Sequence, residues 1–359
     1  MSIDASANHG IDPALIDFQI LGDWMEAQGL AGGPFEDVHL LAGGTQNMLV
    51  RFDRGRRSYV LRRPPPHLRP ASNEVLRRES RVLSALAGSS VRHPGFIAGC
   101  LEDTVMGGAV FYLMEPVDGF NQSVGLPPLH AGSVEIRHQM GLEAADALAE
   151  LGAVDYVAAG LDGLGKPAGF LERQVPRWMG ELETYNKLEG YPGPEIPGLE
   201  DVAHWLDENR PASFTPGIMH GDYHFSNVMY AHGSARLVAI VDWEMCTIGD
   251  PLLDLGGLLN ATAGTLSGGP VPVGAPPTLA TLGGLPTRDE MVRQYASGST
   301  RDLSAVTWYE VLACFKLGIV LEGTHARAFA GLAPRETGDR LHATTMALFA
   351  RAHTLIANG

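Results

Sequence analysis

Apolar residues recur at two different spacings along the chain, and these spacings predict its secondary structure. Short runs in which apolar residues are continuous, or alternate with polar ones, predict β-strands. Such strands are expected at residues 38–42, 48–52, 58–62, 110–114, 228–230 and 237–241. Recurrence every three or four residues predicts helices, which are expected at 72–86, from 133 onward, and at 170–189, 199–209, 303–330 and 336–357. The chain therefore begins strand-rich and becomes helix-rich.

Two further helices have recognisable starting sequences. Asp12 followed by Pro13 predicts the start of a first helix, since aspartate accepts hydrogen bonds from free amides and proline is tolerated at the first helical position. Thr287 and Glu290 form a capping-box pattern that predicts another start. Residues 264–286 hold six glycines and five prolines, so we expect neither helix nor strand there. A loop of that length is usually functional or disordered, and this one could cover the substrate side of a cleft.

A change in composition divides the chain into two parts. The apolar strand expected at 110–114 runs into the polar sequence Glu-Pro-Val-Asp-Gly at 115–119. We expect an N-terminal lobe at residues 1–117 and a C-terminal lobe at residues 118–359. Strands gathered in one lobe and helices in the other predict an α+β protein, with a small antiparallel sheet preceding a larger, mainly helical part.

The residues best suited to chemistry lie in the sequence His-Gly-Asp-Tyr-His-Phe-Ser-Asn at 220–227. Asp222 and Asn227 are five residues apart, and the strand expected at 237–241 leads directly into Asp242. Phosphoryl transfer from a nucleotide needs a carboxylate that accepts the proton of the acceptor hydroxyl, and oxygen ligands that hold Mg²⁺ on the phosphates. We expect Asp222 to be catalytic and Asn227 and Asp242 to bind the metal. A surface loop with two aspartates is the weaker interpretation, because both motifs occur in the right order and at the right separation.

A glycine-rich stretch separates the first two expected strands, and it consists of Gly43, Gly44, Thr45, Gln46 and Asn47. Glycines let the backbone approach a phosphate closely, and successive N–H groups can surround an anion. An ordinary hairpin turn would use the same residue types. Because the stretch precedes the catalytic motifs, we expect a loop that covers the nucleotide.

The third strand ends in arginine at the position where protein kinases have a phosphate-binding lysine. The chain has three lysines, all beyond residue 117: Lys166, Lys187 and Lys316. Arg62 is the expected replacement, because a guanidinium is fully charged and can grip phosphate oxygens with two N–H groups. Glu79, on the helix at 72–86, is the expected partner that orients it, with Glu74 as the fallback. A surface charge pair within that helix is the alternative.

Several motifs together resemble the aminoglycoside phosphotransferase family, the small-molecule branch of the protein-kinase-like fold. His-Gly-Asp, four further residues, Asn, and then Ile-Val-Asp-Trp-Glu carry the resemblance. Tyr-Val-Leu-Arg-Arg-Pro-Pro at 59–65, Arg-Arg-Glu-Ser-Arg-Val-Leu at 77–83 and the sequence 242–255 are similar to the kinase-like domains associated with acyl-CoA dehydrogenases. The resemblance spans residues 36–350. It implies a bilobal fold with ATP and Mg²⁺ as cofactors.

The resemblance also implies roles for residues outside the catalytic motif. The connector between the lobes is expected to bind adenine through its backbone, with Met114, Glu115 and Val117 as candidates. Asp254 resembles a buried aspartate that hydrogen-bonds the backbone of the catalytic loop. His220 is similarly expected to support that loop.

Charge and cysteine content indicate which binding partners and which cellular compartment the sequence fits. The net charge is −15, from 26 basic and 41 acidic residues, which argues against nucleic acid or an anionic membrane as a partner. Residues 118–359 contribute −13 of it, with 15 basic and 28 acidic side chains. This acidity could attract a cationic substrate or simply keep the protein soluble. Three distant cysteines, no signal-peptide pattern and no long apolar run predict a cytoplasmic protein with free thiols.

The function expected from these residues is transfer of the γ-phosphate of ATP to a hydroxyl of a small molecule. The subgroup resemblance favours a hydroxy acid or a hydroxyacyl thioester as acceptor. Kinases of aminoglycosides, choline or homoserine are alternatives that differ only in the acceptor. A catalytically silent nucleotide-binding regulator is an alternative of another class, which the missing lysine would explain.

Overall fold

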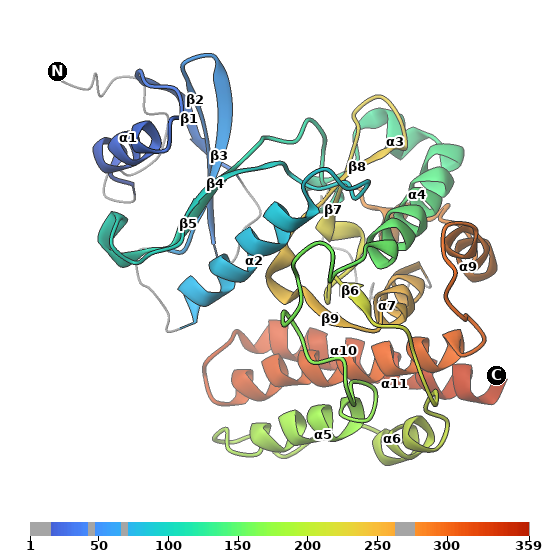
Figure 1. Ribbon diagram of the computed structural model, residues 1–359. Coiled ribbons are helices and arrows are strands. Elements are labelled where there is room, and N and C mark those ends of the chain that lie inside the picture. The colour runs from blue at the N-terminus through green and yellow to red at the C-terminus, as the bar shows by residue number, and fades with distance from the viewer. Residues whose placement is uncertain (1–15, 42–46, 66–70, 263–276, 359) are drawn as a thin grey trace.

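A five-stranded antiparallel sheet forms the N-terminal lobe of the computed structural model, which describes residues 16–41, 47–65, 71–262 and 277–358 (Figure 1). The strand order is β1-β2-β3-β5-β4. The strands are β1 (Phe35–Leu40), β2 (Met48–Arg54), β3 (Arg57–Arg63), β4 (Phe96–Cys100) and β5 (Phe111–Met114). Four of them lie within a few residues of the expected strands, whereas β4 was not expected. In the central strand β3, Arg62 lies opposite Leu49 of β2 and Tyr112 of β5.

The two faces of this sheet pack against different helices. Because side chains alternate along a strand, Tyr59 and Leu61 of β3 point to one face, where they join a separate core with α1 (Phe18–Ala27). Tyr112 points to the other face, toward α2 (Ser72–Leu86), and belongs to the large core shared with the helical lobe. Figure 1 shows α2 between the sheet and the helices of the second lobe. The α2 face of the sheet is therefore the one that meets the site.

The start of α1 differs from the expectation. The predicted cap, Asp12, lies outside the described residues, and the N-cap of the helix that the structure shows is Asp17. The Asp17 carboxylate accepts hydrogen bonds from the backbone N–H groups of Gln19 and Ile20, each at 3.0 Å. Asp17, five residues after Asp12, thus provides the cap; the Asp-Pro pattern at 12–13 had pointed to the wrong aspartate.

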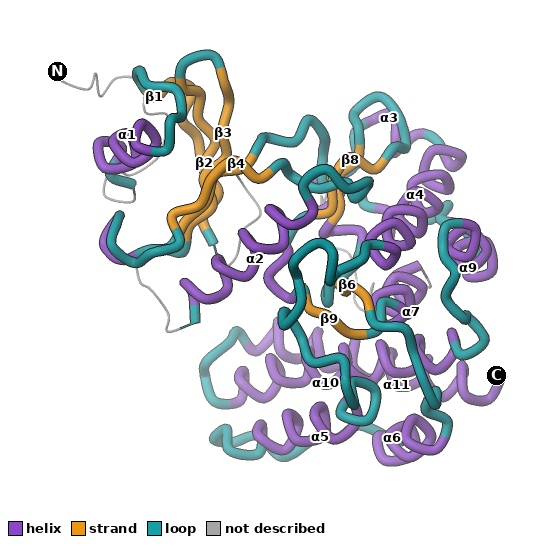
Figure 2. Tube along the Cα trace, viewed as in Figure 1, coloured by secondary structure: helices purple, strands orange, loops and turns teal. Residues whose placement is uncertain are grey.

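The second lobe is mainly helical. Its helices are α3 (Pro128–Gly132), α4 (Val134–Ala153), α5 (Gln174–Tyr185), α6 (Leu199–Glu208), α7 (Leu252–Thr262), α8 (Leu279–Leu282), α9 (Arg288–Ser297), α10 (Val306–Phe329) and α11 (Arg335–Asn358). The long helices α10 and α11 lie side by side, with α5 and α6 along them (Figure 2). Glycine permits this close approach: a Cβ added to Gly318 of α10 would lie 2.7 Å from the ring of Phe349 of α11.

The expectation that residues 264–286 form neither helix nor strand is wrong for part of that range. Residues 263–276 lie outside the described part of the chain, but α8 occupies Leu279–Leu282. The hydroxyls of Thr278 and Thr281 each accept from the other residue's backbone N–H, which forms a capping box. The expected capping box of Thr287 and Glu290 is present at the start of α9. Local capping thus outweighs a high glycine and proline content.

Two small sheets and two short turns hold the catalytic sequence in place. Strand β6 (Gly217–Met219) pairs with β9 (Thr247–Gly249), and β7 (Val228–Tyr230) pairs with β8 (Leu237–Ile240). The 3₁₀ turns η4 (Phe225–Asn227) and η5 (Trp243–Met245) lie between them. This arrangement brings the end of β8 next to the loop after β6. Within the described residues, no helix is both long enough and apolar enough to cross a membrane.

Candidate functional site

Asp254 on α7 holds the loop after β6 in place. The buried Asp254 carboxylate accepts from the backbone N–H of His220 at 2.6 Å and from that of Gly221 at 3.0 Å. Gly221 has a φ of +85°, and a Cβ there would clash with the backbone of Met245, so only glycine fits this position. The structure thus shows the buried contact that the resemblance implies for Asp254.

His220 is a supporting residue rather than a reacting one. Its side chain is fully buried, and its Nε2 lies 2.9 Å from the carbonyl oxygen of Val241, the residue before Asp242. Burial lowers the pKa of His220 to about 4, so the ring is neutral at pH 7. His220 therefore ties the catalytic loop to the end of β8 without carrying a charge.

Asp222 and Asn227 are brought together as their spacing predicts. The Asn227 amide nitrogen donates to the Asp222 carboxylate at 3.0 Å and to the Asp222 carbonyl at 2.9 Å. Burial alone would raise the pKa of Asp222, but a hydrogen bond from His224 and the nearby cation Lys316 help lower it to about 2. His224 Nε2 lies 3.5 Å from that carboxylate. Asp222 is therefore an ionised carboxylate with 54% of its side chain exposed, ready to accept a hydrogen bond.

Asp242 has a strained backbone conformation. Its φ and ψ are +66° and +65°, a left-handed conformation that residues other than glycine rarely adopt. Such strain concentrates at functional sites, because the surrounding structure must stabilise it. The side chain of Asp242 is 42% exposed, and one of its oxygens lies 3.0 Å from the guanidinium of Arg62.

Arg62 and Glu79 form a buried, two-pronged ion pair. Arg62 Nε donates to Glu79 at 2.8 Å and Nη2 donates at 2.6 Å, while the Tyr112 hydroxyl donates to the same carboxylate at 3.3 Å. Burial opposes the charge of Arg62, but Glu79, Tyr112 and Asp242 raise its pKa above the ordinary value. The pairing of the strand arginine with a glutamate of α2 is therefore present, and it involves Glu79 rather than Glu74.

The nucleotide-side candidates are only partly visible. Gly43, Gly44, Thr45 and Gln46 lie outside the described residues, and Asn47 is buried at the start of the second strand.

In the connector, the Glu115 N–H donates to the Gly95 carbonyl at 2.8 Å, and the Glu115 side chain pairs with Arg57 at 2.7 Å. The carbonyl of Glu115 is thus the group through which it could contact a purine. Met114 and Val117 are half-buried on either side of it.

A hollow of about 290 Å³ lies beside the catalytic loop, and the sequence analysis did not identify it. Gly221 and Glu244 border it from the catalytic segment, whereas Arg78 comes from α2, Arg177 from α5 and Lys316 from α10. These residues are up to 238 positions apart, so spacing could not show that they meet. Lys316 lies within residues 36–350, the range of the family resemblance, and that resemblance was the signal available for it.

Comparison with known families identifies the chain. The model of a phosphotransferase enzyme family (APH) matches residues 37–275, which include the motifs just described. The chain belongs to this family. The chain is thus a member of a phosphotransferase family and has a bilobal, protein-kinase-like fold.

Two relatives of this phosphotransferase are much longer than it, and the chain matches only part of each. It is 28% identical to acyl-CoA dehydrogenase family member 10 of Mus musculus over 306 residues, which make up 81% of this chain and 28% of that protein. It is 27% identical to family member 11 of Homo sapiens over 295 residues, which make up 80% of this chain and 36% of that protein. The chain therefore spans about a third of the length of these curated relatives.

Solved structures share the fold of this phosphotransferase. A Ralstonia eutropha structure described as a candidate aminoglycoside phosphotransferase has a TM-score of 0.75 and 27% identity, covering 94% of this chain and 98% of that one. The GDP complex of aminoglycoside 2′-phosphotransferase-IIIa has a TM-score of 0.61 and 14% identity, covering 93% and 98%. At 14% identity the second match shows a common fold alone.

Proposed function

We propose that this phosphotransferase moves the γ-phosphate of ATP to a hydroxyl of a small molecule, with Asp222 as the catalytic carboxylate and a hydroxy acid or hydroxyacyl thioester as acceptor. The observation that carries the proposal is that two clusters lie side by side: Asp222 with Asn227, and Asp242 with the Arg62–Glu79 pair. The N–H of Val241, the residue before Asp242, donates to the Asn227 carbonyl at 2.9 Å and joins them. Similarity to proteins named acyl-CoA dehydrogenases supports an acyl-type acceptor over an aminoglycoside.

Asp222 is suited to receive the proton of the acceptor hydroxyl. Its pKa of about 2 keeps it ionised at pH 7, and its side chain is half exposed. As the hydroxyl oxygen bonds to phosphorus, the bond between phosphorus and the leaving ADP oxygen breaks, and the hydroxyl proton passes to Asp222. Positioning and electrostatics account for most of the catalysis in such reactions.

The metal ligands expected from the sequence suit Mg²⁺. Magnesium prefers oxygen ligands, usually one or two carboxylates together with phosphates. Asp242 supplies a partly exposed carboxylate on a strained backbone, and the Asn227 amide nitrogen faces Asp222, which leaves its oxygen for another partner. When bound, Mg²⁺ would neutralise charge on the phosphates. Arg62 lies 3.0 Å from Asp242, so a cation is next to the proposed metal ligand.

The test is Mg²⁺-dependent transfer from ATP to a panel of hydroxy acids, hydroxyacyl-CoA thioesters, choline, homoserine and aminoglycosides. We expect Asp222→Asn to lower kcat by about 10²- to 10⁴-fold, because a neutral amide cannot accept the proton. Asp201→Asn removes an equal charge from the exposed first turn of α6 and should leave kcat unchanged. No turnover by the wild type, together with no thermal stabilisation by Mg-ATP, would overturn the proposal.

A further inference from the structure

The hollow beside the catalytic loop has the opposite charge to the rest of its lobe. Residues 118–359 carry 15 basic and 28 acidic side chains. Around the 290 Å³ hollow, however, three cations (Arg78, Arg177 and Lys316) surround one carboxylate, that of Glu244. A reversal of sign at a concave site concentrates ligands of the opposite charge. The acidic surface of the lobe is therefore a poor guide to what binds here.

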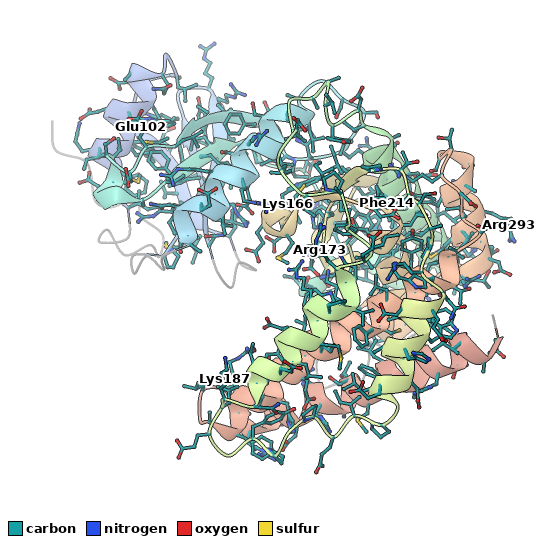
Figure 3. The ribbon with its side chains drawn as sticks, turned by 60° about the horizontal axis from the view of Figure 1, so that its bottom comes forward. Glu102, Lys166, Arg173, Lys187, Phe214 and Arg293 are labelled. Carbon is teal, nitrogen blue, oxygen red and sulfur yellow. The ribbon has the colours of Figure 1, made fainter. Side chains whose placement is uncertain are left out.

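A second hollow extends the positive region away from the catalytic loop. It has a volume of about 330 Å³ and shares Phe170, Gln174, Arg177 and Thr247 with the first. Its own cations are Lys166 and Arg173, which Figure 3 shows close together where α5 begins. Arg173 Nη2 donates to the Lys166 carbonyl at 2.5 Å, which holds the two residues side by side. The two hollows thus form one elongated region that contains five cations.

The cations differ in how far the protein already uses them. Arg78 donates to the Cys246 carbonyl at 2.8 Å, and Lys316 donates to the Gly221 carbonyl at 2.8 Å, so both are tied to the catalytic segment. Arg177 is exposed and stacks on Trp178, with 4.9 Å between its guanidinium carbon and the ring centroid. Among the described residues no carboxylate forms an ion pair with Arg177. Stacking fixes the plane of the guanidinium while its N–H groups stay available.

We propose that this region binds the anionic part of the phosphate acceptor, a carboxylate or a phosphate, and that Arg177 is its principal contact. The inference rests on the proposed function, because it assigns the acceptor of the same site. Gly221 borders the first hollow and precedes Asp222, so the acceptor hydroxyl lies at that end. Phe170, Trp178 and Met219 supply an apolar wall suited to a hydrocarbon chain between the two ends. An anion with a short chain and a hydroxyl fits this order of groups, whereas a polycationic aminoglycoside does not.

The test compares matched acceptors and variants. A hydroxy acid, its neutral methyl ester, its CoA thioester and choline are assayed with wild type, Arg177→Ala and Arg293→Ala. Arg293 lies exposed on α9, on the far side of the helical lobe from Lys166 and Arg173 in Figure 3, and its removal changes the net charge equally. We expect Arg177→Ala to raise the KM of the anionic acceptors about 10- to 100-fold, as for a lost hydrogen bond to a charged group. Arg177→Ala should leave the KM of the methyl ester unchanged. Arg293→Ala should leave the KM of every acceptor unchanged.

Variants of Lys166 and Arg173, the cations of the second hollow, distinguish the two possible sources of negative charge, the carboxylate and the phosphates of CoA. If the phosphates of CoA occupy the second hollow, Lys166→Ala and Arg173→Ala will raise the KM of the thioester and leave that of the free acid unaltered. If the anion is the carboxylate itself, the free acid will be the better acceptor and only Arg177→Ala will matter. Either pattern supports the anion site and identifies its ligand.

Binding by calorimetry in the presence of Mg-ADP provides a readout that does not depend on turnover. Preference for choline or an aminoglycoside, or equal binding of the anions to wild type and Arg177→Ala, would overturn the anion site while leaving the phosphotransferase intact. No binding of any anionic acceptor to the wild type would also overturn it. Failure of the proposed function is different, because it would appear as a lack of both Mg-ATP binding and transfer to every acceptor.

Discussion

Two cations reach the catalytic residues from opposite lobes, and they do so in different ways. Arg62, on the sheet, is held by Glu79 through two hydrogen bonds and extends a third contact of 3.0 Å to Asp242. Lys316, on α10, donates to the Gly221 carbonyl at 2.8 Å and lies within the electrostatic reach of Asp254 and Asp222. Arg62 therefore joins the two lobes, whereas Lys316 stabilises the loop from within its own lobe.

This difference separates two tasks: contact between the lobes, which Arg62 makes, and support of the loop, which Lys316 provides. A guanidinium with a planar set of donors can be fixed by one carboxylate and still contact another, which an ammonium on a flexible chain does less well. Arg62 thus makes one contact between the lobes through Asp242, the expected metal ligand. The contact of Lys316 does not cross between the lobes. Substitutions at the two positions should consequently differ in stability, in activity or in both.

The largest effect is expected from Arg62→Ala. This change leaves the fully buried Glu79 without its cation and with only the Tyr112 hydroxyl as a donor, and breaking a buried ion pair in this way costs about 3–5 kcal/mol of unfolding free energy. Transfer activity should be lost as well, because Asp242 loses its cation. Urea denaturation at pH 7, together with an activity assay, measures both effects.

Two further variants control for this result. Arg57→Ala removes an exposed pair with Glu115 and should cost no more than about 1 kcal/mol. Arg62→Lys keeps the charge but loses one of the two hydrogen bonds to Glu79. Compared with Arg62→Ala, it should recover part of the stability and a smaller part of the activity. Equal stability of Arg62→Ala and wild type would show that the ion pair does not hold the lobe.

A smaller effect is expected from Lys316→Met, which keeps the length of the side chain and removes its charge. The Gly221 carbonyl would lose its donor and the buried Asp254 its nearby cation, so the loop should shift and kcat should fall about 10- to 100-fold, as for a lost hydrogen bond from a charged group. Lys187→Met is the matched control, since Lys187 is exposed at the far end of α5 (Figure 3). The free energy of unfolding should fall less than in Arg62→Ala, because no buried carboxylate loses a partner that binds it through two hydrogen bonds.

The contrast between these cations also shows what the sequence could predict. The range of α2 and the strand position of Arg62 followed from periodicity, which is a local pattern, whereas the partner Glu79 was chosen over Glu74 from the family resemblance. Lys316 and Arg177 could not be placed, since they meet the loop only through the packing of α5 against α10. Strand β4 was missed as well, and its short sequence, which contains a glycine, carries no clear alternation. The division between residues 117 and 118 stays a prediction.

The smallest effect is expected from pH, and it concerns Asp254, which both Lys316 and the loop contact. Burial raises the pKa of Asp254 to about 6, against the lowering by Lys316 and by the N–H groups of His220 and Gly221. As the pH falls through about 6, Asp254 gains a proton, accepts the two loop N–H groups less strongly, and kcat should fall. Asp222, with a pKa of about 2, stays ionised and cannot cause this fall.

Stability has contributions of both signs over the same pH range, so urea denaturation is measured beside kcat to separate this effect from unfolding. The raised pKa of Asp254 means that the folded state binds the extra proton between pH 3.8 and about 6, so that contribution to stability is lost as the pH rises. The lowered pKa of His220 has the opposite sign, because the unfolded state binds the extra proton between about 4 and 6.5. Each is worth about 3 kcal/mol at 1.36 kcal/mol per pKa unit, so these two oppose each other, whereas the pKa of buried Glu79, raised to about 7, adds a contribution of the same sign as that of Asp254. We therefore expect a kcat profile with an acid limb near pH 6 in the wild type and a low and flat profile in Asp254→Asn. An acid limb that persists in Asp254→Asn would assign it to another group.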